Sequence, residues 1–235
     1  MARIGQLAAP DQRGPAMTDH KLVFHYAPRS RASTLRILLD ELGANYELKV
    51  HNAKAGDLQS PEYLKINPLG KVPALQDGET LITESIAIAL HVADLYPEAG
   101  LTPGLTDPRR GAYLRWMLFY AASFEPAVVN KAFDTDIPRQ IAPYCTYDAV
   151  MKTLAAQLEK APHILGDQIS AADIFWGSAL RWTLMFDLVP DWPVFTEYAE
   201  RITARPSFQR VLENEAVLDA EQEAAANPAR IDAAS

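Results

Sequence analysis

The N-terminal part of the chain alternates between short apolar runs and one helical repeat. Apolar runs typical of strands occupy residues 21–26 and 46–50. Between them, leucines recur with a helical period, at Leu35, Leu38, Leu39 and Leu42. Gly43 then provides a typical helix end. A helix between two short strands predicts a βαβ unit with parallel strands, and residues 61–66 fit one further short helix.

A proline-containing hairpin follows. Residues 72–76 are short, apolar and strand-like, and Leu81-Ile82 provides the second strand. Between these runs, Asp77-Gly78 is a dipeptide that type I′ hairpin turns favour. Thr83 is placed to cap a helix over residues 84–96. The hairpin and this helix therefore complete an α/β unit.

The pattern changes to long helices beyond a linker rich in Pro and Gly. The expected helices cover residues 107–131, 140–161, 170–187, 192–204 and 206–215. The segment after Ala216 is rich in Ala and Glu, and we expect it to fray. The sequence thus predicts a flexible extension, an α/β domain, a linker, an all-α domain and a tail, over residues 1–19, 20–97, 98–106, 107–218 and 219–235.

One helix start in the C-terminal part carries a strong capping signal. Ser170 and Asp173 have the spacing of a capping box, with Asp in the Glu/Gln position, and Ile169 and Ile174 fit the accompanying hydrophobic staple. The helix that follows is apolar on nearly all sides, which predicts a central, buried position. We therefore interpret Asp173 as a structural residue, and its capping contribution would be roughly 0.5–2 kcal/mol.

Composition narrows the possible functions. The chain has 235 residues, 49% of them hydrophobic, and a formal net charge of -8, which argues against a nucleic-acid or anionic-membrane partner. Its one cysteine, Cys145, excludes an internal disulfide framework and fits a reducing, cytoplasmic compartment. No apolar run approaches a membrane span, and the five histidines lack metal-site spacing, so we expect no metal.

The hairpin also contains a candidate binding edge. Pro73 cannot donate to a strand ladder, so it suggests an edge, a bulge or a cis peptide bond. A cis bond would turn the N–H and C=O groups of Val72 outward, free to pair with the backbone of a ligand. Glu84-Ser85 opens the next helix, and a helix start with a free N–H and a hydroxyl is a suitable carboxylate site.

In combination, Lys71-Val72-Pro73 and Glu84-Ser85 resemble the glutathione-binding half of the glutathione transferase family, and the resemblance covers roughly residues 21–215. It implies a thioredoxin-like domain of order βαβ-α-ββα packed on an all-α domain, and a homodimer. It also implies that Val72 pairs with the cysteinyl backbone of glutathione before a cis Pro73.

The same resemblance assigns further contacts to the tripeptide. Ser85 is expected to take the γ-glutamyl carboxylate and Glu84 the ammonium group, although Glu is also common in any first helical turn. Lys71 and Lys54 are expected to meet the glycine carboxylate. The alternative for each lysine is a solvated surface charge.

The implied reaction needs a thiolate at neutral pH, whereas a free thiol has a pKa near 8.5. Lowering that pKa by about two units takes roughly 2.7 kcal/mol. A charge-assisted hydrogen bond supplies ~1.5–3 kcal/mol, and a helix N-terminus adds ~0.3–1 kcal/mol. One hydroxyl at the start of the first helix is therefore sufficient, and Ser30 is so placed.

Several neighbours compete with Ser30 for this role. Ser33, Tyr26 and the charge of Arg31 are alternatives, and Ser30 could simply cap the helix while the backbone binds the thiol. Against the beta-class pattern Tyr-x-Pro-x-x-Cys, Arg31 stands at the cysteine position. The chain therefore looks closer to the serine-type classes, and mixed-disulfide chemistry at that position is excluded.

The resemblance finally implies the reaction, which is conjugation of the glutathione thiolate to a small hydrophobic electrophile. The second substrate is expected between Ser30 and the helix over 107–131, near Tyr113, Trp116 and Tyr120, for which helix core or dimer contact is the alternative. Other glutathione-dependent reactions fit the same site: peroxidase, isomerase, dehalogenase or ether cleavage. A non-catalytic binding or regulatory module of this fold is the remaining alternative.

Overall fold

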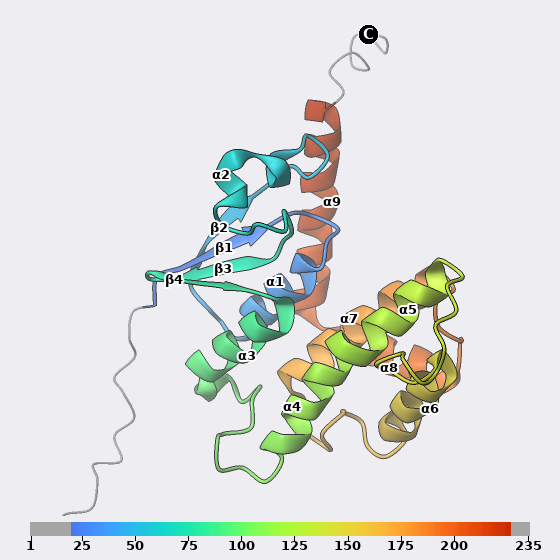
Figure 1. Cartoon of the computed structure of the whole chain (residues 1–235). Coiled ribbons are helices and arrows are strands. Elements are labelled where there is room, and N and C mark those ends of the chain that lie inside the picture. Colours follow the sequence, from blue (N-terminus) through green and yellow to red (C-terminus); the bar gives the residue numbers. More distant parts are fainter. Residues whose placement is uncertain (1–19, 227–235) are drawn as a thin grey trace, which may run out of the picture.

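The computed structural model of the protein describes residues 20–226 and shows a small sheet domain beside a larger group of helices (Figure 1). The extension expected over 1–19 and the end of the tail, 227–235, lie outside the described residues. The sheet has the strand order β2-β1-β3-β4. Its strands are β1 (Leu22–Tyr26), β2 (Tyr46–Val50), β3 (Ala74–Asp77) and β4 (Thr80–Thr83).

Helices cover both faces of this sheet. Figure 1 shows α2 (Pro61–Leu64), preceded by the short turn η1 (Asp57–Gln59), on one face, and α1 (Ala32–Glu41) and α3 (Ser85–Leu95) on the other. β1 is parallel to β2 and antiparallel to β3, which is antiparallel to β4. This confirms the predicted thioredoxin-like order. The second half of the sheet begins two residues later than predicted, at Ala74, because Pro73 has no N–H for the ladder.

The strand directions gather four separate segments at one end of the sheet. β1, β2 and β4 all finish there, and β3 begins there. In the order of the strands, this end carries residues 51–54 after β2, residues 27–30 after β1, the Val72-Pro73 pair before β3, and Glu84-Ser85 after β4. Nearly all of the residues singled out as a binding edge therefore lie along one line.

The rest of the chain is helical. After the short turn η2 (Pro97–Ala99), the helices are α4 (Arg110–Phe119), α5 (Glu125–Ala132), α6 (Tyr147–Leu158), α7 (Ala171–Met185), α8 (Pro193–Thr203) and α9 (Pro206–Ala226). Three of the predicted helices differ from those observed. The helix expected over 107–131 is interrupted by a π-helical turn, η3 (Tyr120–Phe124), because Pro126 lacks the N–H that would continue the ladder to Ala122.

The other two differences concern a helix start and a helix end. The helix expected from residue 140 begins at Tyr147, where the Thr146 side chain caps it by accepting from the N–H of Ala149 at 3.2 Å. Cys145 consequently lies in the preceding loop, with φ of 73°. The last helix continues to Ala226 instead of ending near 215, because its final turns pack on the sheet domain.

α7 is the central helix, as its apolar sequence predicted. Its buried residues run from Ala171 to Thr183, and Trp176 packs among the rings of Trp116, Tyr120 and Phe124. The predicted capping box is present at its start. Across residues 20–226, no helix has both the length and the apolar character needed to cross a membrane.

Gly177 permits the close crossing of α7 over α8. A Cβ at this position would lie 2.5 Å from Cγ2 of Ile202. Alanine is normally the better helix former by about 1 kcal/mol, but overpacking reverses the sign here, and we expect Gly177→Ala to destabilise by about 1–3 kcal/mol in urea unfolding. Gly111→Ala in α4 is the matched control, because nothing lies within 4 Å of its would-be Cβ. A Gly177→Ala protein as stable as the control would contradict this packing argument.

Candidate functional site

The Val72–Pro73 peptide bond is cis, as the sequence suggested. Within residues 20–226, the N–H and C=O groups of Val72 make no hydrogen bond, although Val72 is only half-buried. The preceding carbonyl, of Lys71, is held firmly by the Tyr63 hydroxyl at 2.7 Å and by Nδ2 of Asn67 at 2.8 Å. The loop therefore presents one donor and one acceptor on a fixed backbone, which is what a short extended peptide needs in order to pair.

The start of α3 is the second prepared position. Glu84 has φ of 68° and ψ of 118°, a conformation that non-glycine residues rarely adopt, and Ser85 is the first residue of the helix. Within the described part of the chain, the side chains of both residues are without a hydrogen-bond partner. Backbone strain of this kind is often found at ligand-binding positions. The pair is thus free to meet a charged ligand group.

At the start of α1, Ser30 is engaged only with the backbone. Its Oγ donates to the carbonyl of Ala27 at 2.7 Å and accepts from the N–H of Ala32 at 3.1 Å. The residue before it, Arg29, has φ of 54°. Ser30 therefore stabilises the turn before α1, whose N-cap residue is Arg31, and its hydroxyl proton is donated to a neutral acceptor.

Sequence reasoning missed a carboxylate that α9 brings to the same place. Glu215 is buried and accepts hydrogen bonds from the Tyr26 hydroxyl at 2.6 Å, from the N–H of Arg29 at 3.2 Å and from the Ser33 hydroxyl. Burial and this bond raise the pKa of Tyr26 above its ordinary value. Both Tyr26 and Ser33 consequently have their protons committed to a carboxylate.

The sequence did contain a signal for this contact. Phe208 and Val211 are buried on α9, and Glu215, Asp219 and Gln222 continue the same stripe at helical spacing. Because the later members of the stripe are polar, the pattern resembles a solvated helix end. Only the contacts that these polar residues make with the sheet domain show that this part of α9 is not a solvated helix end.

Lys54 and Arg29 meet at a second carboxylate of α9. The Lys54 ammonium lies 2.8 Å from Oδ1 of Asp219, and Nε of Arg29 lies 3.0 Å from Oδ2. The hydrogen bond from Lys54 lowers the pKa of Asp219. The expected ligand cation, Lys54, is therefore paired within the protein. Lys71, the other lysine expected at the glycine carboxylate, is exposed and makes no ion pair within residues 20–226.

A further ion pair joins the two domains near Ser30. Nε of Arg31 lies 2.6 Å from Oε1 of Glu125, and the Tyr120 hydroxyl lies 3.4 Å from the same oxygen. Arg31 is thus neutralised by the helical domain. The contact places the start of α1 opposite the junction between η3 and α5.

The aromatic residues expected to face the second substrate are buried. Tyr113 is 0%, Trp116 3% and Tyr120 8% exposed. Tyr113 and Trp116 belong to the core of the helical domain, which is the alternative that the sequence left open. Tyr120, through its hydroxyl 3.4 Å from Glu125, lies beside the ion pair that joins the two domains.

Two histidines, one in β1 and one directly after β2, contact each other. His25 Nδ1 and His51 Nε2 lie 2.9 Å apart, and the ring of Tyr63 packs edge-on to both. The pKa of His25 is lowered to about 4, chiefly by burial and further by the nearby His51 and Lys49. Burial also lowers the pKa of His51. Both rings are therefore neutral in the folded protein near pH 7.

This pair predicts a loss of stability in mild acid. Unfolded histidine has a pKa of about 6.5, so between pH 6.5 and 4 the unfolded chain binds protons that folded His25 does not. The contribution of neutral His25 to the free energy of unfolding is fully present above pH 6.5. On the order of 2 kcal/mol of it is lost as the pH falls towards 4.

Urea unfolding at several pH values measures this effect, with His25→Gln expected to flatten the profile and His163→Gln, in the helical domain, as the control. An unchanged slope in His25→Gln would exclude the pair as its source.

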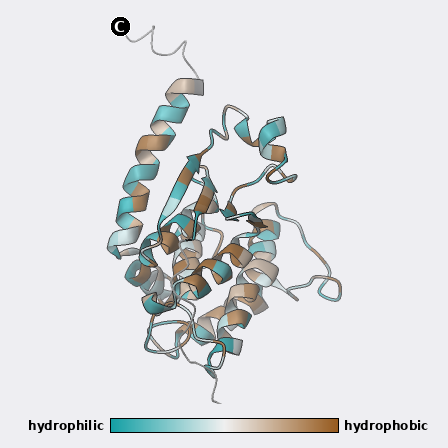
Figure 2. Cartoon of the chain, turned by 90° about the vertical axis from the view of Figure 1, so that its left-hand side faces the viewer, coloured by the Kyte–Doolittle hydropathy of each residue, from teal (hydrophilic) through white to brown (hydrophobic). Residues whose placement is uncertain are grey.

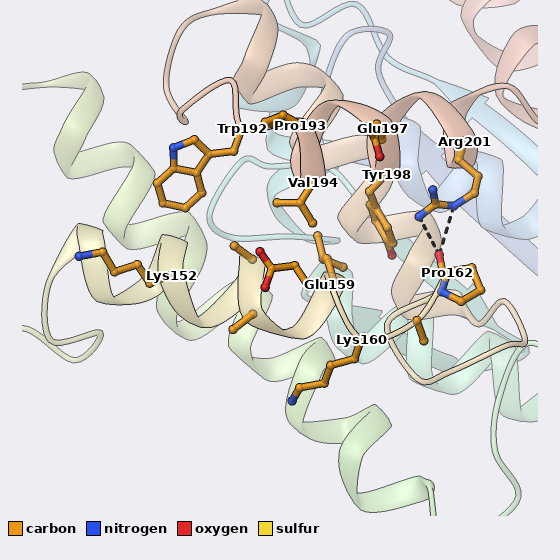
Figure 3. A pocket seen from close by; sticks show the side chains of 14 residues that line it. Lys152, Glu159, Lys160, Pro162, Trp192, Pro193, Val194, Glu197, Tyr198 and Arg201 are labelled. Carbon is orange, nitrogen blue, oxygen red and sulfur yellow. Dashed lines mark hydrogen bonds between the residues drawn. The ribbon is translucent and has the colours of Figure 1, made fainter.

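A hollow of about 800 Å³ lies elsewhere, between α6 and α8 (Figure 3). Trp192 and Lys152 stand at one end, and Arg201 stands at the other, where its guanidinium donates to the Pro162 carbonyl at 2.8 and 3.2 Å. None of the predicted site residues lines it. In residues 20–226, no group of three or more His, Cys, Asp or Glu side chains is arranged to hold a metal.

Comparison with known proteins matches both halves of the chain. A family model described as Glutathione S-transferase, N-terminal domain, matches residues 21–94, and Glutathione S-transferase, C-terminal domain, matches residues 146–206. The first match contains Val72, Pro73, Glu84 and Ser85. The second contains the capping box and the whole of α7.

Individual relatives agree with these matches. The chain is 30% identical over 216 residues to Glutathione S-transferase 2 of Triticum aestivum, covering 80% of this chain and 72% of the relative. It is 30% identical over 204 residues to disulfide-bond oxidoreductase YfcG of Escherichia coli K12, covering 80% and 93%. A sphingomonad glutathione S-transferase solved in complex with glutathione superimposes with a TM-score of 0.68 at 27% identity, covering 83% and 98%.

Proposed function

The chain belongs to the glutathione S-transferase family, and on this premise we propose that it binds glutathione and conjugates its thiolate to a small hydrophobic electrophile. The observation that carries the proposal is the cis Val72–Pro73 bond, beside which one N–H and one C=O are free to pair. It lies between the start of α1 and the start of α3, the two helix N-termini that an anionic thiol and a carboxylate would need.

The dimensions of the sheet end suit a tripeptide. Neighbouring strands are about 4.8 Å apart, so the four strand ends span about 14 Å. An extended tripeptide spans about 10 Å. With its γ-glutamyl end at Glu84-Ser85 and its cysteinyl backbone on Val72, the glycine would point across β1 towards Lys54 and Lys71.

The hydrogen-bond inventory favours Ser30 as the partner of the sulfur. Tyr26 and Ser33 donate to the carboxylate of Glu215, and Arg31 is paired with Glu125. Ser30 donates to a neutral carbonyl, and a charge-assisted bond to a thiolate is roughly twice as strong as such a bond. Rotation of one hydroxyl therefore exchanges a weaker bond for a stronger one.

The second substrate is proposed to lie where the start of α1 faces the helical domain, near Tyr120. This position would hold an apolar electrophile against the thiolate, and joining two substrates in one site supplies much of the rate. The homodimer expected from the family remains part of the proposal, and light scattering in solution tests it.

Retention on immobilised glutathione and conjugation of an activated aryl chloride test the proposal. Binding together with conjugation supports a transferase. Binding without conjugation, followed by turnover of a peroxide, a haloalkane, an aryl ether or a mixed disulfide, would assign one of the other glutathione-dependent reactions to the same thiolate. Failure to bind glutathione would leave only the non-catalytic module.

A further inference from the structure

The first half of α9 is anchored strongly to the rest of the protein. Phe208 and Val211 are buried in the core. Arg205, directly before the helix, pairs with Glu41, and Arg210 pairs with Asp40, at the end of α1. The start of the helix therefore combines apolar burial with an ion pair in its first turns and another at the residue before it.

The second half of α9 is held differently. Figure 2 shows the helix rising beside the sheet domain, with hydrophilic and hydrophobic stretches alternating along it. Val217 is 58% exposed, and Leu218 is the one residue of this half that packs, partly buried, against the core. The other contacts beyond Glu215 are polar, namely Asp219 with Arg29 and Lys54, Glu223 with Lys54 at 3.8 Å, and Gln222 with the backbone of His51 and with Asn52. Asp219 is 7% exposed, but both of its cations are at least 46% exposed, and ion pairs with such solvated partners contribute little to stability and are screened by salt. This segment can consequently detach at low cost in free energy.

Asp219 sits where the proposed ligand would end. Arg29 follows β1 and Lys54 follows β2, the two strand ends beyond Val72 in the order of the sheet. Their side chains are 69% and 46% exposed, so solvent reaches both cations. A ligand carboxylate arriving from Val72 has the same chemistry as Asp219 and would compete for the same two cations.

We propose that Arg29 and Lys54 form a carboxylate site that Asp219 occupies in the free protein. The glycine carboxylate of glutathione displaces Asp219 from this site, and the displacement releases the last turns of α9. The inference rests on the proposed function, since it takes glutathione as the ligand. It adds Arg29 to the binding residues, and it makes Asp219 of α9 compete with the ligand for the two cations.

Calorimetry with glutathione and with its glycine ethyl ester tests the competition, because the two ligands differ only in that carboxylate. Asp219→Asn should bind glutathione about threefold to tenfold more tightly than the wild type does, with no gain for the ester. Glu221→Gln removes the same charge from an exposed position of α9 and should change neither affinity. Equal gains for both ligands, or weaker binding of glutathione to Asp219→Asn, would overturn the proposal.

Hydrogen exchange gives an independent measurement on the same proteins. Saturating glutathione should raise exchange of the amides of residues 219–226 about tenfold and leave those of 208–211 unchanged, and the ester should have no such effect. Unchanged protection with glutathione bound would overturn displacement while leaving the proposed function intact. Failure of every variant to bind either ligand would overturn both.

Discussion

Replacing Asp173 with alanine is expected to destabilise the protein by about 3–5 kcal/mol, the largest effect on stability of any single change considered for this chain. Asp173 is 0% exposed, and its carboxylate accepts four hydrogen bonds. The donors are the N–H of Ile164 at 2.7 Å, the Tyr198 hydroxyl at 2.6 Å, and the N–H and hydroxyl of Ser170, both at 2.8 Å. Alanine would leave these buried donors unpaired and a cavity beside them.

Urea unfolding of Asp173→Ala beside Asp167→Ala tests this expectation. Asp167 lies in the loop before α7 and is exposed, so its replacement should change stability by no more than about 0.5 kcal/mol. A loss of only about 1 kcal/mol for Asp173→Ala would show that Asp173 acts as a simple helix cap and not as the centre of a buried network.

Replacing Ser30 with alanine is expected to have the largest effect on activity. If Ser30 is the hydrogen-bond donor to the thiolate, Ser30→Ala should raise the pKa of the bound glutathione thiol by about one to two units. With a wild-type pKa about two units below 8.5, the thiolate population at pH 7, and with it kcat/KM for conjugation, should then fall about 3- to 25-fold. Ultraviolet titration of the thiolate in the binary complex measures the pKa directly.

Ser33→Ala is the matched control, because Ser33 lies one helical turn further on and donates to Glu215. We expect its thiol pKa to equal that of the wild type. A Ser30→Ala protein with an unchanged titration would remove Ser30 from the mechanism, and a shifted pKa in Ser33→Ala would transfer the role to Ser33. Both variants should be compared well below their unfolding temperatures, since Ser30 also accepts from the N–H of Ala32.

The sequence was most informative where local chemistry alone determines the structure. Pro73 indicated a break in the ladder: the displaced strand start follows from its missing N–H, and its tertiary amide makes the cis bond accessible. The capping box at Ser170 and the apolar helix after it likewise depend on residues three or four positions apart. Such features can be predicted because every partner lies nearby in the chain.

The sequence was least informative where the partner lies far along the chain. Glu215 and Asp219 look like solvated residues of a helix end, yet they contact residues 150 or more positions earlier, including Tyr26 and Lys54. Tyr113 and Trp116 have the spacing of cleft residues but face the core. Helical periodicity shows which residues share a face of a helix, but it does not show which other element packs against that face. The same contacts decide which hydroxyls remain free beside the thiol site.

The central claim is that glutathione lies across the end of the sheet, with its backbone on Val72 and its sulfur at Ser30. A crystal structure of the protein with glutathione tests it most directly. We predict that the cysteinyl N–H and C=O pair with Val72 and that the sulfur lies within hydrogen-bonding distance of Ser30 Oγ. Glutathione bound away from Val72, or with its sulfur against another side chain, would contradict the account.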